Sequence, residues 1–260
     1  MKTWILITLL LILAVVPVVA QPQKADPVQT ANPIPVEGET VEEITGPQPV
    51  IEVPEQKFDF GYAPEGYYMA HSFAVKNTGE GELRIQRVRT TCGCTSAPMK
   101  KMQLEPGEET EVTVVFNSTR YQHKTSKSAI ITSNDPVNRS VRITFSANMD
   151  ESTFPLAVEP RALDIARGED PPEKMVFEIN NPSESDVHLE VIDYSADVFA
   201  KPDLKSEKIK AGKSTEIVLE LADEFDAAAN YIKASVTLQA KGLEGEPVIF
   251  TIPVKGSGPS

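Results

Sequence analysis

Residues 104–116 read Leu-Glu-Pro-Gly-Glu-Glu-Thr-Glu-Val-Thr-Val-Val-Phe, and residues 209–221 read Ile-Lys-Ala-Gly-Lys-Ser-Thr-Glu-Ile-Val-Leu-Glu-Leu. In each stretch a glycine-containing turn precedes residues that alternate between polar and apolar. In the first stretch Val112, Val114 and Phe116 share one face. Alternation with a period of two is typical of a half-buried β-strand. Both stretches are therefore predicted to be strands that follow a tight turn.

The motifs around these two stretches also recur in the same order. Ser-Phe-Ala-Val-Lys-Asn-Thr-Gly at 72–79 corresponds to Met-Val-Phe-Glu-Ile-Asn-Asn-Pro-Ser at 175–183. Short alternating segments in units of about 100 residues, separated by turn residues, are typical of immunoglobulin-like β-sandwiches. The sequence therefore predicts an all-β chain with two tandem immunoglobulin-like β-sandwich domains, over residues 50–150 and 153–257.

The first 49 residues have a different character. Lys2 precedes an apolar run from Trp4 to Val16, and Val18 and Ala20 are the small residues that a signal peptidase reads. We expect a signal peptide over residues 1–20; an uncleaved signal anchor is the alternative, and it is the one predicted route to a membrane. Residues 21–49 hold six prolines and five carboxylates against one lysine, which predicts a disordered linker rich in proline and acidic residues.

Composition excludes several classes of function. The chain has 25 Lys and Arg against 38 Asp and Glu, a formal net charge of -13. Broad binding to nucleic acid or to anionic membranes needs an excess of basic residues, so we expect neither. Among recognisable motifs there is no catalytic triad, zinc-protease, phosphate-loop or dinucleotide pattern. The expectation is a protein without enzymatic activity or cofactor.

One group of motifs resembles a known family. Thr-Thr-Cys-Gly-Cys-Thr at 90–95, followed by Leu-Glu-Pro-Gly-Glu at 104–108 and Ile-Ile-Thr-Ser-Asn-Asp-Pro at 130–136, resembles the bacterial secreted domain of unknown function 1573. That family is similar to Hydin-type immunoglobulin-like domains. The likeness covers about residues 50–148. It implies an extracytoplasmic, protein-binding or scaffolding role, with no catalytic residues to carry over.

Cys92 and Cys94 are the two cysteines of the chain, and three interpretations of them stay open. They could form a disulfide across Gly93, which an exported location favours. They could instead be packed thiols, or one could pair with another chain. In the third interpretation the thiols act in redox exchange or bind Cu(I). Candidate extra donors for that ion are Met99, Met102, His71 and His123.

Five basic residues bracket the cysteines in the sequence, and they form a candidate docking patch for an acidic partner: Arg84, Arg87, Arg89, Lys100 and Lys101. The alternative is an ordinary solvated surface whose cations pair with neighbouring glutamates. Charge divides unevenly between the predicted domains. Residues 50–152 carry 12 basic and 13 acidic groups (-1), whereas residues 153–260 carry 11 and 20 (-9).

These observations predict an exported protein, periplasmic or at the cell surface. Its expected role is non-catalytic: an interaction or scaffold protein that binds an envelope or surface protein, with partner strands pairing to exposed sheet edges. The alternative function is a periplasmic thiol-redox or Cu(I)-handling protein that uses Cys92 and Cys94.

Overall fold

The computed structural model describes residues 46–227 and 229–256. The predicted signal peptide and residues 21–45 of the predicted linker lie outside this part. The last residues of the predicted linker are folded: Pro49 is buried, and the carbonyl of Gln48 accepts the backbone N–H groups of Glu80 and Gly81. No helix in the described residues is long and apolar enough to cross a membrane.

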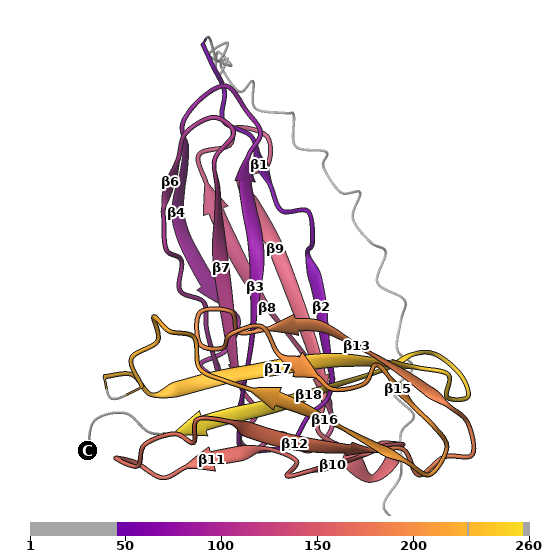
Figure 1. Cartoon of the computed structure of the whole chain (residues 1–260). Helices are drawn as coiled ribbons and strands as arrows, with labels where there is room; N and C mark the ends of the chain where they lie inside the picture. The colour runs from indigo at the N-terminus through magenta and orange to yellow at the C-terminus, as the bar shows by residue number, and fades with distance from the viewer. Residues whose placement is uncertain (1–45, 228, 257–260) are drawn as a thin grey trace, which may run out of the picture. The chain divides into compact units, whose positions relative to one another are not determined.

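The fold is all-β and of the immunoglobulin-like sandwich type, as predicted (Figure 1). Two four-stranded sheets each pack against part of a ten-stranded sheet. The first small sheet has the order β1 (Ile51–Glu52), β3 (Tyr68–Asn77), β7 (Glu109–Asn117), β5 (Thr95–Ser96). The second has the order β10 (Ala157–Glu159), β12 (Met175–Asn180), β16 (Ser214–Leu219), β14 (Asp203–Leu204).

The ten-stranded sheet contains strands from both halves of the chain. Its order is β15 (Lys208–Ile209), β13 (Val187–Tyr194), β17 (Ile232–Lys241), β18 (Val248–Gly256), β2 (Lys57–Tyr62), β9 (Ser140–Asn148), β8 (Lys124–Ser133), β4 (Leu83–Thr90), β6 (Gln103–Leu104), with β11 (Leu163–Ile165) on β18. A 3-10 turn, η1 (Glu151–Thr153), connects the halves.

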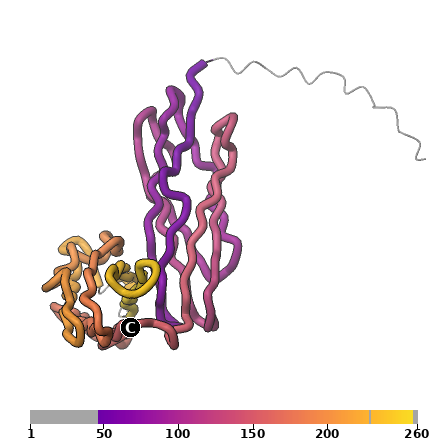
Figure 2. The backbone as a smooth tube through the Cα atoms, turned by 90° about the vertical axis from the view of Figure 1, so that its right-hand side faces the viewer, coloured from indigo at the N-terminus to yellow at the C-terminus, as the bar shows by residue number. Residues whose placement is uncertain are grey.

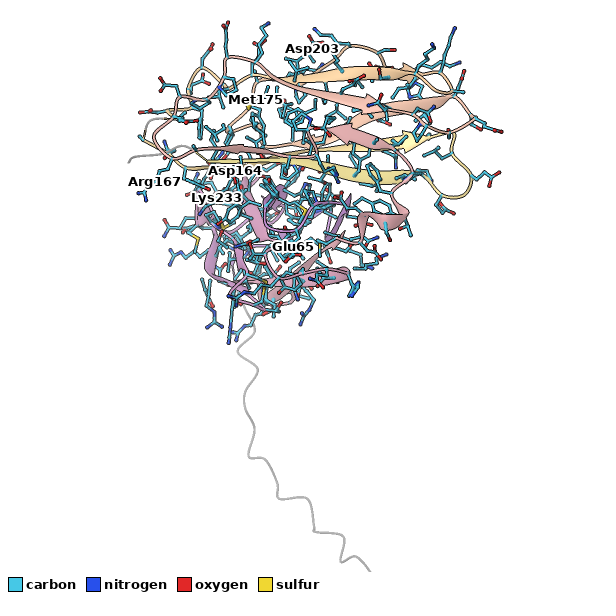
Figure 3. The ribbon with its side chains drawn as sticks, turned by 90° about the horizontal axis from the view of Figure 1, so that it is seen from below. Glu65, Asp164, Arg167, Met175, Asp203 and Lys233 are labelled. Carbon is cyan, nitrogen blue, oxygen red and sulfur yellow. A yellow bond between two sulfur atoms is a disulfide. The ribbon has the colours of Figure 1, made fainter. Side chains whose placement is uncertain are left out.

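The alternating residues that predicted strands also build two hydrophobic cores. We call β1–β9 the first sandwich and β10–β18 the second sandwich; their strands lie in separate groups in Figure 2. Phe73, Val112 and Phe145 are fully or almost fully buried in the first core. Phe177 and Met175 are buried in the second, where Met175 lies between the layers (Figure 3). The described residues nevertheless form one compact unit.

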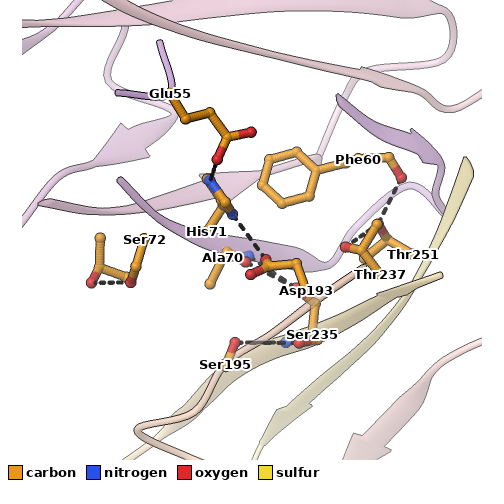
Figure 4. A network of polar contacts seen from close by, with 11 residues as sticks. Glu55, Phe60, Ala70, His71, Ser72, Asp193, Ser195, Ser235, Thr237 and Thr251 are labelled. Carbon is orange, nitrogen blue, oxygen red and sulfur yellow. Dashed lines mark hydrogen bonds and ion pairs between the residues drawn. The ribbon is translucent and has the colours of Figure 1, made fainter. Parts of the chain in front are cut away.

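Several contacts join the two sandwiches. Strand β18 pairs with β2 in parallel at Phe250 and Tyr62, and Thr251 donates its hydroxyl to the carbonyl of Phe60 at 2.6 Å. On β3, the N–H of Ala70 donates to Ser235 Oγ of β17 at 3.0 Å (Figure 4). Shared backbone pairing of this kind was not predicted, because the sequence pattern identifies strands but not their neighbours in a sheet.

Candidate interaction sites

The Cys92–Cys94 pair lies in the loop between β4 and β5. The structure joins the two sulfurs in a disulfide, with Cα atoms 5.3 Å apart. Both sulfurs lie near one buried hydroxyl: Thr95 Oγ1 is 3.4 Å from the Cys92 sulfur and 3.7 Å from that of Cys94. Neither cysteine is a free thiol in this arrangement, so reductant is needed before either could act as a nucleophile or a ligand.

The candidate copper donors do not gather around the cysteines. Met99 packs against the first core, and Met102 is 40% exposed. His71 contacts Glu55 and Asp193 instead, and His123 is exposed. Across residues 46–227 and 229–256, no group of three or more His, Cys, Asp and Glu is arranged to hold a metal ion.

Arg120, which sequence proximity to the cysteines did not reveal, lines the same hollow as Cys94. Cys94 lines an open hollow together with Asn117, Thr119, Arg120 and Tyr121. Arg120 has a φ of 71°, a left-handed conformation that is uncommon outside glycine, and its N–H donates to Glu65 Oε1 at 3.0 Å. A turn thus brings Arg120, 26 positions after Cys94, to the hollow that Cys94 lines.

The predicted basic patch separates into two groups. Three members are paired with glutamates: Arg84 with Glu82 at 2.7 Å, Lys101 with Glu108 at 2.5 Å, and Lys100 with Glu111 at 3.8 Å. The hydrogen bond from Arg84 lowers the pKa of Glu82 and raises that of Arg84 itself. These exposed pairs contribute little to stability and leave three fewer cations free for a partner.

The two other members, Arg87 and Arg89, lie on a face that the sequence did not reveal. On the exposed side of the ten-stranded sheet, Arg89 is in register with Ile130 of β8, which is in register with Arg142 of β9. Lys57 of β2 is in register with Thr144 of β9, one step further along. Residues in register point to the same side of a sheet. We call Lys57, Arg87, Arg89 and Arg142 the cationic face.

His71 occupies the contact between the two sandwiches. It is 7% exposed and stacks on Phe58 with 3.6 Å between ring centres. Its Nδ1 lies 3.0 Å from Asp193 Oδ2, and its Nε2 lies 3.5 Å from Glu55 Oε2. Neither contact has hydrogen-bond geometry, so both act as ion pairs only when the imidazole is protonated. His71 therefore packs between the two sandwiches, against Phe58 of the first and Asp193 of the second.

An open groove of about 770 Å³ runs beside β13 in the second sandwich. Leu189 and Val191 form its wall on β13, and Pro202 and Leu204 form the opposite wall around β14. The rest of the lining is charged or ionisable, so the groove presents both polar and apolar groups. A hydrogen bond from Lys241 lowers the pKa of Glu190 on one side, and Asp203 lies at the outer edge of the second sandwich on the other (Figure 3).

The strand that borders the groove has a partly free edge. Strand β15 pairs with β13 only at Val187 and His188, and the N–H of Leu189 donates to the carbonyl of Glu207 at 2.6 Å. Since N–H groups alternate in direction along a strand, that of Val191 points to the same side as that of Leu189. In the described part of the chain β13 has no strand partner on this side beyond Leu189.

One known protein family matches the first sandwich, which contains Cys92 and Cys94. Residues 51–149 match the family described as Protein of unknown function (DUF1573). The first sandwich matches the DUF1573 family. No curated protein matches the chain.

Solved structures show a distant likeness to the chain. A protein of unknown function from Porphyromonas gingivalis W83 is 16% identical, covering 79% of this chain and 98% of its own, with a TM-score of 0.35. An ASH/PapD-like domain of human CEP192 is 13% identical, covering 45% and 96%, with a TM-score of 0.33. The CupB2 chaperone of Pseudomonas aeruginosa is 12% identical, covering 77% and 99%, with a TM-score of 0.30. Likeness at this level carries no argument about the activity of this DUF1573-containing chain.

Proposed function

We propose that this chain is a non-catalytic, exported interaction protein that binds a protein of the cell envelope or surface. An immunoglobulin-like β-fold with a DUF1573 domain fits a non-catalytic interaction role. Export is supported by the sequence of residues 1–20, with its charged start, apolar run and small-residue end. The proposal rests on one observation above all, the free edge of β13 beside the groove.

An extended peptide is the ligand that this edge fits. A strand that lies beside β13 would receive the N–H of Val191 and offer its own donors to the outward carbonyls of the same edge. Alternate side chains of that strand would point into the groove, between Val191 and Leu204. Backbone pairing supplies affinity in such a complex, and the mixed apolar and charged lining of the groove selects the side chains.

The test separates backbone pairing from side-chain packing at Val191. Val191→Pro removes the outward N–H, whereas Val191→Ala keeps it and is the matched control. A photo-reactive amino acid in place of Lys201, an exposed residue of the groove, reports the partner; the same probe at Val137, which is 84% exposed in the β8–β9 turn, reports chance encounters.

We expect one envelope protein to cross-link to the probe at position 201 in the otherwise unchanged chain and in the Val191→Ala background. The adduct should disappear in the Val191→Pro background while the melting temperature stays close to that of the unchanged chain. Equal cross-linking from position 137, or an adduct that persists with Val191→Pro, would contradict the proposal.

A further inference from the structure

A second charged surface lies on the outer face of the second small sheet. Glu178 of β12 is directly opposite Glu159 of β10 on one side and Glu216 of β16 on the other. All three side chains are exposed. We call these residues the acidic row. Like charges directly opposite each other destabilise a sheet, so the row has an electrostatic cost in the isolated chain.

Nothing in the described residues offsets that cost with an ion pair. None of the three carboxylates has a salt-bridge partner there. Lys205 lies next to Glu216 at the end of the row, since its N–H donates to the carbonyl of Glu216, but its ammonium contacts Asp203. The acidic row therefore keeps an excess of negative charge.

The cationic face carries positive charges that likewise lack ion-pair partners in the described residues. Lys57, Arg87, Arg89 and Arg142 are all exposed, and none of them is within ion-pair distance of a carboxylate in the part of the chain that the structure describes. Arg142 instead donates to Ser128 Oγ at 2.8 Å. Asp59, further along the same face, accepts from Ser146 and from the N–H of Gly61. In a chain of net charge -13, four cations without a carboxylate partner among the described residues, on one face of a sheet, need a specific reason.

The two surfaces match in spacing as well as in sign. Arg89 and Arg142 lie in one row, two strands apart, with Ile130 between them. Glu159 and Glu216 also lie in one row, two strands apart, with Glu178 between them. Two strand spacings are about 10 Å in each case. Two sheet faces with equal spacing and opposite charge can form several ion pairs at once.

We infer that the cationic face of one copy binds the acidic row of a second copy. The two surfaces are different patches, so the contact is head to tail, and each bound copy leaves one surface of each kind free for the next. A single contact relieves the repulsion among the three carboxylates of the acidic row and gives Arg89 and Arg142 of the cationic face carboxylate partners. This self-association uses neither the groove nor the free edge of β13, so it is independent of the function proposed above.

Electrostatic association between exposed groups depends on salt. Charges act over about 30 Å at 0.01 M ionic strength and over about 3 Å at 1 M. The exported protein should therefore show a mass that rises with concentration in sedimentation velocity at low ionic strength, and it should be monomeric at high ionic strength. A monomer at every concentration in low salt overturns the inference.

Two neutralising variants identify the surfaces. Arg89→Gln/Arg142→Gln removes charge from the cationic face, and Glu178→Gln/Glu216→Gln removes it from the acidic row. We expect each variant alone to associate at least about tenfold more weakly than the unchanged chain. Lys210→Gln/Lys213→Gln and Glu173→Gln/Glu184→Gln change the same numbers of exposed charges elsewhere and should leave self-association unaltered.

Mixing the two variants provides the decisive measurement. The first keeps its acidic row and the second keeps its cationic face, so an equimolar mixture should form a complex of one copy of each and nothing larger. A mixture that stays monomeric, while the unchanged chain associates, overturns the inference. So does binding of dextran sulfate through the cationic face by a chain that remains monomeric, because that outcome assigns the face to an external polyanion.

Discussion

Asn77 and Asn181 make the same hydrogen bonds at corresponding places in the two sandwiches. The side-chain amide of Asn77 donates to the carbonyls of Gly81 and Leu104, at 2.8 and 3.0 Å. That of Asn181 donates to the carbonyls of Ser185 and Ile209, at 2.8 and 3.3 Å. Both residues are buried. Each asparagine therefore ties the end of its strand to the turn that follows it and to a short strand of the ten-stranded sheet, β6 or β15.

Replacing Asn77 should destabilise the first sandwich. Asn77→Ala leaves two buried carbonyls without their donor, which costs about 1–3 kcal/mol of unfolding free energy. Asn77→Asp retains an acceptor for the N–H of Gly79 but removes the donors and places charge beside the carbonyls, so we expect it to cost at least as much. Urea unfolding measures both changes. Equal midpoints for Asn77→Ala and the exposed control Asn138→Ala would show that the bonds contribute nothing.

The sequence predicted the strands better than their partners. Alternation at 109–117 is a local property, so β7 could be identified before the structure was known. The role of Asn77 depends on Leu104, which is 27 positions away, and the repeated Asn signals a turn rather than a buried donor. The cationic face needs the register of β4, β8, β9 and β2, which no local pattern contains. The predicted docking patch included Lys100 and Lys101 because they are close to the cysteines in the sequence, but in the structure both contact glutamates.

Gly61 should tolerate no side chain where the two sandwiches share a sheet. It has a φ of 63°, and a Cβ added there would lie 1.9 Å from the carbonyl oxygen of Ile249. Gly66 has a φ of 86° but open space around the same position. Gly66→Ala therefore measures the backbone strain alone, about 1 kcal/mol. We expect Gly61→Ala to lower the unfolding free energy by clearly more, because β2 and β18 must move apart. Equal losses for the two variants would contradict this account.

Asp135 should make the first sandwich sensitive to acid. Burial of its carboxyl group opposes ionisation, but the backbone N–H groups of Asn138, Ile51 and Val137 outweigh burial and lower the pKa of Asp135. A pKa that is lower in the folded state contributes stability above the unfolded value of about 3.9, and this contribution is lost as pH falls through the folded value.

Asp135→Asn should therefore be most harmful at neutral pH. We expect a loss of about 1–3 kcal/mol at pH 7, which shrinks as the pH falls below about 4 because the unfolded chain then binds a proton at Asp135 that the folded carboxylate still excludes. Thermal unfolding across this pH range measures the difference, with the exposed Asp223→Asn as control. A difference that stays constant down to pH 2 would show that ionisation of Asp135 is not the cause.

The Cys92–Cys94 disulfide should matter little for stability. It closes a loop of three residues, for which constraint of the unfolded chain supplies only about 1.5 kcal/mol. Cys92→Ala/Cys94→Ala should therefore lower the melting temperature by a few degrees and leave the core packing intact. Intact-mass measurement of the protein isolated from cells, with and without reductant, should show a difference of about 2 Da if the bond forms in the cell.

The same variant tests the alternative role in redox or copper chemistry. Met99, Met102, His71 and His123 do not converge on Cys92 and Cys94, so a reduced chain has two thiols and no further donor from this set close by. We expect the reduced protein to retain no stoichiometric Cu(I) against a competing chelator. Tight, stoichiometric Cu(I) binding that Cys92→Ala/Cys94→Ala abolishes would instead assign the disulfide loop a role in copper chemistry. The two reduced cysteines would then have drawn in further Cu(I) donors that lie apart from them in the oxidised structure.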